Sequence, residues 1–206
     1  MEPSKHATLG GTAFAALLVA AGTSGGQTAP TPGALPPTPM PPASSIERRL
    51  ADQERRIGSG LQDGTLTSGE AARLQREESR LNREWARDKA DGVVTPQEAA
   101  RMEGNLNRAS RDIYNERHDA QRANPNNPFN QRLGNQADRI ANGIQDGSLT
   151  NREAARLERG ESRLAGEEAR FRRDGNLSPW ERRKLNRDLD RESRQIYRAR
   201  DNRGHR

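Results

Sequence analysis

The feature that most constrains the fold of this chain is an internal duplication. Residues 56–117 align without a gap onto residues 139–200, at an offset of 83, and about half of the aligned positions are identical. The segment R-I-G-S-G-L-Q-D-G-T-L-T of the first copy corresponds to R-I-A-N-G-I-Q-D-G-S-L-T of the second. Because self-similarity of this kind indicates a repeated structural unit, both copies are expected to adopt the same fold.

Apolar residues within each copy recur at the spacing of an α-helix. Steps of three, four and seven positions place each set on one helix face, so we expect three amphipathic helices per copy. The stripes of the first copy are Ile46, Leu50, Ile57 and Leu61; Leu74, Leu81 and Trp85; and Met102, Leu106 and Ile113. Those of the second copy are Leu133, Ile140 and Ile144; Leu157, Leu164 and Phe171; and Leu185, Leu189 and Ile196.

These stripes predict an all-α protein made of two tandem copies of a three-helix unit. The units would form a helical bundle or an elongated helical array after a disordered N-terminal region. We expect the first repeat at 45–120, a linker with two prolines at 121–130, and the second repeat at 131–202. Hydrophobic residues make up only 30% of the chain, so the apolar seams are narrow and a second chain can complete them.

The N-terminal segment has the features of an exported protein. Lys5 and His6 precede a short apolar run over 13–21, which is typical of a secretory signal peptide at 1–21. The run is too short for a comfortable membrane span; an uncleaved anchor is the alternative. Many prolines indicate an extended linker at 22–44. We expect a periplasmic or secreted protein, with no membrane span after signal cleavage.

A shorter motif, D-G-x-[LV]-[TS]-x-x-E, occurs twice in each copy, and one interpretation of it is helix punctuation. The Gly ends one helix in a left-handed conformation, the Thr or Ser caps the next helix, and the Glu completes a capping box. This interpretation explains every shared residue except the Asp. The motifs span Asp63–Glu70, Asp91–Glu98, Asp146–Glu153 and Asp174–Glu181. A basic residue three positions after each Glu favours a local ion pair, at Arg73, Arg101, Arg156 and Lys184.

The second interpretation of the motif is calcium binding. The motif resembles the second half of an EF-hand loop, in which an Asp, a Gly, an apolar residue and a bidentate Glu fall at these spacings. The first half does not match, because Leu61 and Lys89 stand at ligand positions, whereas Asn142 makes the third loop the most complete. Calcium is thus the one cofactor that the sequence suggests. Its ligands would come from Asn142, Asp146, Glu153, Asp63, Glu70, Asp91, Glu98, Asp174 and Glu181.

Two S-R-x-I-Y segments, 110–114 and 193–197, are the other shared feature of the copies. The Ile of each segment is expected in the core and the Tyr at its edge. Alternatively, the segments form matching contact patches for a protein partner, through Arg111, Tyr114, Arg194 and Tyr197. Together with the repeated turns, these segments resemble a family of secreted bacterial repeat proteins with degenerate EF-hand-like turns. That resemblance covers most of the chain beyond the linker and implies no particular activity.

The residue inventory argues against catalysis. The chain has no Cys, which excludes disulfides and thiolate chemistry, and His118 is the one histidine placed near a predicted helix. We therefore expect no enzyme. The leading hypothesis is an exported, non-enzymatic interaction or structural protein that binds an unknown protein partner or itself. The alternatives are divalent-cation binding and arginine-mediated polyanion binding. Because 29 acidic residues are interspersed among 35 basic ones, no specific nucleic acid is expected.

Overall fold

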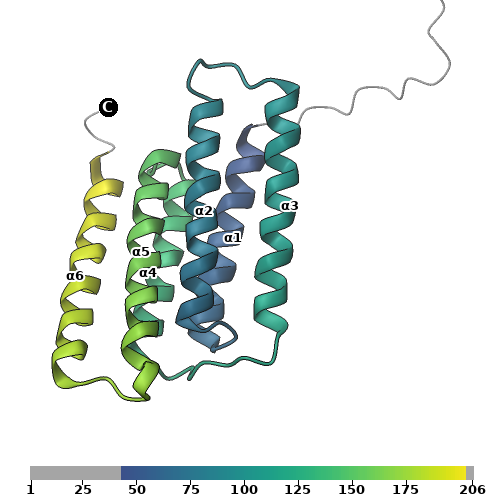
Figure 1. Cartoon of the computed structure of the whole chain (residues 1–206). Helices are drawn as coiled ribbons and strands as arrows, with labels where there is room; N and C mark the ends of the chain where they lie inside the picture. The colour runs from purple at the N-terminus through teal and green to yellow at the C-terminus, as the bar shows by residue number, and fades with distance from the viewer. Residues whose placement is uncertain (1–42, 203–206) are drawn as a thin grey trace, which may run out of the picture. The chain divides into compact units, whose positions relative to one another are not determined.

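The computed structural model describes residues 43–202, which form six α-helices and one short 3-10 helix (Figure 1). The helices are α1 Ala43–Asp63, α2 Ser68–Asp88, α3 Pro96–His118, α4 Pro128–Gln145, α5 Asn151–Phe171, η1 Arg172–Asp174 and α6 Pro179–Asp201. This range contains no strand, so the predicted all-α class is confirmed. Among the described residues, no helix combines the length and apolar character that crossing a membrane requires.

Two predicted segments fall largely outside the described residues. They are the signal peptide at 1–21 and the linker at 22–44, of which only the last two residues are described. Ala43 and Ser44 belong to the first turn of α1, so this helix begins two residues earlier than predicted. The connection between α3 and α4 covers residues 119–127, so it begins and ends two to three residues earlier than the linker predicted at 121–130.

The repeated motif ends and starts helices as the punctuation interpretation predicts. Its four glycines have φ between 70° and 90°, the left-handed region that other residues adopt at a cost. In each motif the Thr or Ser hydroxyl accepts the N–H of the Glu, whose carboxylate accepts the N–H of the cap. All four capping boxes are formed, with caps at Thr67, Thr95, Thr150 and Ser178.

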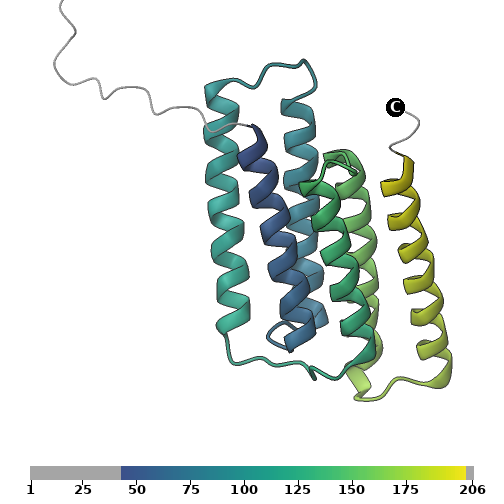
Figure 2. The ribbon, with the colours of Figure 1, turned by 180° about the vertical axis from the view of Figure 1, so that it is seen from behind.

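The two copies interlock instead of packing as separate bundles. The most extensive helix contacts join α2 to α5 and α1 to α4, so two helices of each copy build a central four-helix bundle. The third helix of each copy lies outside it, with α3 against α1 and α2 and α6 against α4 and α5. The front and back views place α3 and α6 at opposite edges (Figures 1 and 2).

Equivalent hydrogen bonds relate the two copies by a pseudo-two-fold axis. Ser79 Oγ on α2 donates to the Ala155 carbonyl on α5 at 2.7 Å, and its counterpart Ser162 donates to the Ala72 carbonyl at 2.8 Å. Both bonds are buried, and each member of one bond is 83 positions from its equivalent. The same equivalence holds between the central bundle and the third helix of each copy. Gln53 on α1 donates to the Leu106 carbonyl on α3, and Gln136 on α4 donates to the Leu189 carbonyl on α6.

On the other side of the bundle, α1 and α4 are in backbone contact. A Cβ atom on Gly134 would lie 2.6 Å from the Gly58 carbonyl oxygen. A Cβ atom on Gly58 would lie 3.0 Å from the Gly134 carbonyl oxygen and 3.1 Å from Ala137 Cβ. These distances leave little or no room for a side chain, so glycine is required where the two copies approach most closely.

The predicted apolar stripes form the core. Every stripe residue is buried except Phe171, which is half-buried beside one of the core clusters. Most of the buried apolar residues fall into three clusters, and each of the helices α1, α2, α4 and α5 contributes to more than one cluster. Buried polar residues, several of them glutamates, also lie on the inward faces of these helices.

The glycine contact predicts opposite effects for two similar substitutions. Gly134→Ala should lower the free energy of unfolding by about 1–3 kcal/mol, because the new methyl group meets the Gly58 carbonyl. Gly104→Ala on α3 has no neighbour within 4 Å and should raise it by roughly 0.5–1 kcal/mol through helix propensity. Urea denaturation followed by circular dichroism measures both. A stabilising Gly134→Ala would contradict the close α1–α4 contact.

Candidate functional site

The nine residues predicted as calcium ligands lie in the four turns and on α4, and the carboxylates among them have protein partners. In every motif, Oδ1 of the Asp accepts the N–H of the residue two positions later, at 2.8–3.2 Å. This local turn explains the Asp, the one motif residue that helix capping left unexplained. The four Glu carboxylates accept the cap N–H groups at 2.7–2.9 Å. Calcium binding at these loops stays a prediction.

An arginine from the last turns of α3 or α6 also binds one Asp of each copy. Arg117 pairs with Asp63 at 2.8 Å, and its equivalent Arg200 pairs with Asp146 at 2.9 Å. Asn142, the residue that made the third loop most complete, is exposed on α4, and its carbonyl accepts the Asp146 N–H at 2.9 Å. A cation at either loop would therefore compete with a guanidinium group for the same carboxylate.

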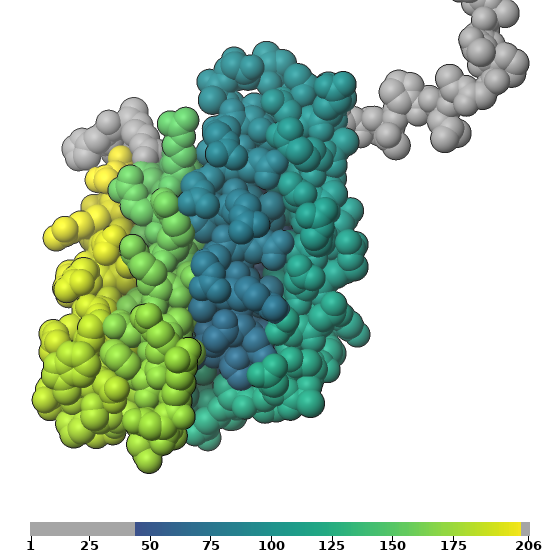
Figure 3. All heavy atoms as spheres, viewed as in Figure 1, coloured from purple at the N-terminus to yellow at the C-terminus, as the bar shows by residue number. Residues whose placement is uncertain are grey.

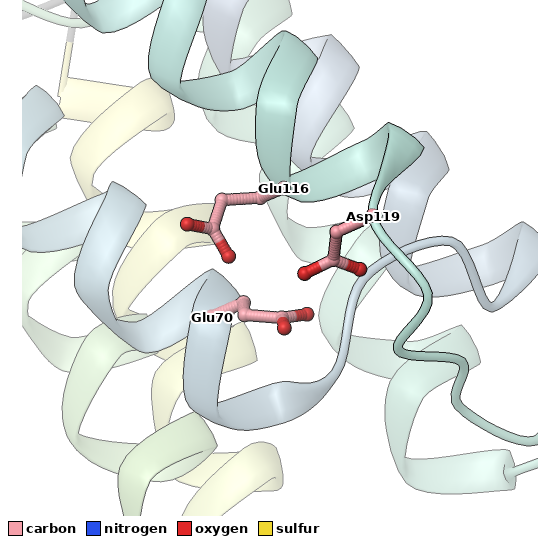
Figure 4. Close-up of side chains that lie close together, drawn as sticks. All are labelled: Glu70, Glu116 and Asp119. Atoms are coloured by element: carbon pink, nitrogen blue, oxygen red, sulfur yellow. The ribbon is translucent and has the colours of Figure 1, made fainter.

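Three carboxylates converge beside the first turn, as Figure 4 shows. Glu70 at the start of α2 meets Glu116 and Asp119 at the end of α3, with one oxygen of each within 4.8 Å of the others. Arg73 pairs with Glu116, Thr67 N–H donates to Glu70, and Gln121 N–H donates to Asp119. Only Glu70 was predicted as a ligand. The other two were missed because no repeat marks them: Ala199 and Asn202 stand at the equivalent positions of the second copy.

The S-R-x-I-Y residues lie at opposite edges of the bundle, on α3 and α6. Arg111 and Arg194 are exposed, and so are Tyr114 and Tyr197, at 56% and 64%. The structure therefore does not bring the two segments together into one surface. Their serines have an internal role, because Arg56 and Arg139 donate to Ser110 and Ser193 at 2.7 and 2.9 Å. His118 is exposed, and its ring stacks on that of Tyr114.

A groove between α2 and α5 collects arginines from both copies. Its volume is about 750 Å³, and Figure 3 shows the face of the bundle on which these helices lie side by side. Arg76 and Arg80 are the equivalents of Arg159 and Arg163, so the pseudo-two-fold places the same pair on each wall. The full lining is Arg76, Arg80, Arg83, Arg159, Ser162, Arg163, Gly166, Glu167 and Arg170.

The positive charge of this groove is balanced only in part, because Arg80, Arg83 and Arg163 interact with the carboxyl groups of Glu77, Glu158 and Glu192 without an ion pair to them in the described residues. Within residues 43–202, none of its six arginines forms an ion pair. Its one acidic lining residue, Glu167, is paired with Lys184. In a second arginine-lined pocket, against α6, Arg132 is instead paired with Asp190. Unpaired guanidinium groups on facing walls suit phosphate or carboxylate ligands, to which they donate bidentate hydrogen bonds.

The interior of the bundle holds a layer of carboxyl groups, which we call the buried carboxyl layer. Its four glutamates are at most 1% exposed: Glu54 on α1, Glu78 on α2, and Glu158 and Glu161 on α5. Gln75 on α2, also fully buried, faces Glu54. The sequence does carry a signal for three of them. In three apolar stripes, two successive residues are seven positions apart, and the position on the same helix face between them, four after the first, is a glutamate. These steps are Leu50–Ile57, Leu74–Leu81 and Leu157–Leu164.

Burial shifts these carboxyl groups toward the neutral form. It raises the pKa of Glu54 to about 8, against a lowering effect of Gln75 and with a further increase from Asp138. Burial is likewise the largest cause that raises the pKa of the other three. Mutual repulsion adds to it, as do Glu77 and Glu192, while Arg56, Arg83 and Arg139 at the edges of the layer lower these pKa values.

Comparison of the chain with protein families, with curated proteins and with solved structures gave no significant match.

The buried carboxyl layer predicts that stability falls as pH rises. Between about pH 4.5 and pH 8 the folded chain keeps a proton on Glu54 that the unfolded chain has released, so deprotonation favours unfolding. The melting temperature, measured with a chelator present, should therefore decrease from pH 5 to pH 9. Glu54→Gln cannot ionise and should raise the melting temperature at pH 8 by at least about 2–4 °C, equivalent to about 1 kcal/mol.

Asp52→Asn is the matched control for this prediction. Asp52 is on the same helix, two positions before Glu54, but its side chain is exposed, so the variant should keep the pH dependence of the original chain. A melting temperature that is flat from pH 5 to pH 9, or an equal slope in Glu54→Gln, would contradict the role assigned to the layer.

Proposed function

We propose that the protein is an exported, non-enzymatic helical binding module that holds a phosphate-bearing polyanion in the groove between α2 and α5. The observation that carries this proposal is the set of six arginines in the groove, none of which forms an ion pair within residues 43–202, although its acidic lining residue Glu167 does. Collecting like charges without partners is unfavourable for the protein alone. An anionic ligand would remove that repulsion.

The spacing of the arginines favours a ligand with several charges. Arg76 and Arg83 are seven residues apart, which corresponds to about 10 Å along the helix, and Arg159 and Arg170 span about 16 Å. A single phosphate cannot reach all of these positions, whereas neighbouring phosphates of a polymer can. The pseudo-two-fold also offers equivalent arginines on both walls, which suits a ligand built from repeated units.

The mixed composition of the chain is compatible with this function, because the charges are sorted in the fold. Many acidic residues form ion pairs with basic residues outside the groove, such as Glu84 and Asp88 with Arg101, and Asp190 with Arg132. The interspersed acids that argued against an anion-binding surface in the sequence therefore contribute little negative charge to the groove itself. The proposal combines two hypotheses from the sequence, the non-enzymatic interaction protein and arginine-mediated polyanion binding, because the polyanion is the ligand of the interaction protein.

The proposal predicts salt-dependent binding that depends on groove arginines. Labelled inorganic polyphosphate, followed by fluorescence anisotropy, should bind the full chain with an affinity that falls as salt rises. The double variant Arg80→Gln/Arg163→Gln removes one equivalent arginine from each wall. It should bind at least tenfold more weakly and lower the slope of log affinity against log salt by about 1 per arginine.

The matched control is Arg111→Gln/Arg194→Gln, which removes the same charge from equivalent positions on α3 and α6. It should bind like the original chain. If this control loses binding while the groove variant keeps it, the contact lies at the S-R-x-I-Y segments and the proposal is wrong. It is also wrong if no salt-dependent binding is detected. A single-stranded oligonucleotide used as competitor shows whether nucleic acid is an equally good source of phosphates.

A further inference from the structure

We propose that the buried carboxyl layer is a binding site for a divalent, oxygen-preferring cation inside the four-helix bundle. This site is distinct from the turns and does not depend on the function of the groove. Its ligands would be four glutamates and one amide, contributed by three helices: Glu54, Gln75, Glu78, Glu158 and Glu161.

The helix geometry places these residues at one level of the bundle. Gln75 and Glu78 are three positions apart on α2, as are Glu158 and Glu161 on α5, so each pair shares one helix face. The two pairs are also equivalents under the offset of 83, and thus face each other across the pseudo-two-fold axis. The bonds of the adjacent serines, Ser79 and Ser162, fix this register. Metal sites in helical bundles are built from inward-facing side chains on facing helices, glutamates among them, and part of those side chains come in pairs three positions apart.

The hydrogen bonding of the layer is incomplete, which points to a missing ligand. Neither carboxylate oxygen of Glu54 or Glu161 has a hydrogen-bond partner, and one oxygen each of Glu78 and Glu158 lacks one. The Gln75 side chain is an independent indication. It is fully buried and faces Glu54, but neither of its amide atoms reaches a partner at normal hydrogen-bond geometry. Each such atom costs about 1–3 kcal/mol when left unsatisfied, so a bound cation would offset a large penalty.

The chemistry of the donors selects the class of metal. All of them are oxygens, and the layer contains no His or Cys, which favours Mn²⁺, Mg²⁺ or Ca²⁺ over Zn²⁺ or Cu²⁺. Of the three arginines at the edges of the layer, Arg56 and Arg139 donate to Ser110 and Ser193, and Arg83 lines the groove. The glutamate side chains of the layer must rotate before their oxygens can surround one ion. Among the described residues, the carboxylates whose oxygens already lie within 4.8 Å of one another are those of the first turn.

Binding of a cation to this layer should release protons. Glu54 and Glu161 are fully buried, which disfavours their charged form, and a carboxyl group must lose its proton to bind a metal ion. Proton release therefore separates binding in the interior from binding to exposed carboxylates, which are already ionised. Calorimetry in two buffers with different ionisation enthalpies counts the protons released.

The test uses Mn²⁺ on the full chain after treatment with a chelator. Calorimetry and the loss of the free Mn²⁺ signal in electron paramagnetic resonance should show saturable binding with proton release at pH 7, and the melting temperature should rise. Glu161→Gln and Glu54→Gln should each weaken binding at least tenfold while circular dichroism stays helical. Either variant suffices if the other fails to fold. Ca²⁺ and Mg²⁺ titrations then rank the cations.

Two controls locate the site. Glu116→Gln/Asp119→Asn removes the converging carboxylates of the first turn, and Asp63→Asn/Asp146→Asn changes the turns; both should keep Mn²⁺ affinity and proton release. The proposal is overturned if no saturable binding occurs up to millimolar Mn²⁺. It is equally overturned if binding is lost in a control but kept in Glu161→Gln, because the ion would then lie at the surface.

Discussion

Backbone contact between α1 and α4 holds the two copies of the repeat together on one side of the bundle. Gly58 and Gly134 allow this contact, because a side chain at either position would meet the carbonyl of the other. On the other side, two buried serine–carbonyl bonds lock α2 against α5 in a single register. A three-helix unit with such a narrow apolar stripe has little core of its own. Interlocking lets each copy complete the core of the other.

The same α2–α5 pairing builds both candidate sites. Successive residues of a helix point about 100° apart, so Arg76 faces the groove while Gln75 lies in the buried carboxyl layer. The pseudo-two-fold then doubles each feature, with arginines on both walls outside and glutamates on both helices inside. The two features also interact through the carboxyl groups that lie beneath the groove. Arg83, for example, lines the groove and lowers the pKa of Glu158 beneath it.

Features that depend on local sequence could be predicted, and those that depend on contacts between helices could not. Stripes and capping boxes involve residues within one or two turns, and the structure confirms them. The ion pairs expected three positions after each motif Glu are replaced at Arg73, Arg101 and Lys184 by pairs with other helices or other turns. An ion pair at that spacing is worth only a few tenths of a kcal/mol, so a neighbouring helix that offers a better-placed carboxylate prevails.

The candidate sites show the same division between local and tertiary information. The groove arginines look like an ordinary solvated helix face until α2 and α5 are placed together. Glu116 and Asp119 meet Glu70 only because α3 returns beside the start of α2. The buried glutamates are an intermediate case. Their position within the apolar stripes is visible in the sequence, but a lone charged residue at such a position is equally compatible with the edge of a narrow seam.

The central claim is that the two copies interlock within one chain, and engineered cysteines test it most directly. The chain has no cysteine, and a Cβ atom on Gly69 of α2 would lie 3.8 Å from Ala169 Cβ of α5, a distance suited to a disulfide. In Gly69→Cys/Ala169→Cys, mild oxidation should give an intramolecular disulfide in the monomer, seen by intact mass and reversed by reductant. Gly104→Cys/Ala169→Cys, with one cysteine on the distant α3, should not. Free thiols, or disulfide-linked dimers alone, in the first variant would contradict the interlocked bundle.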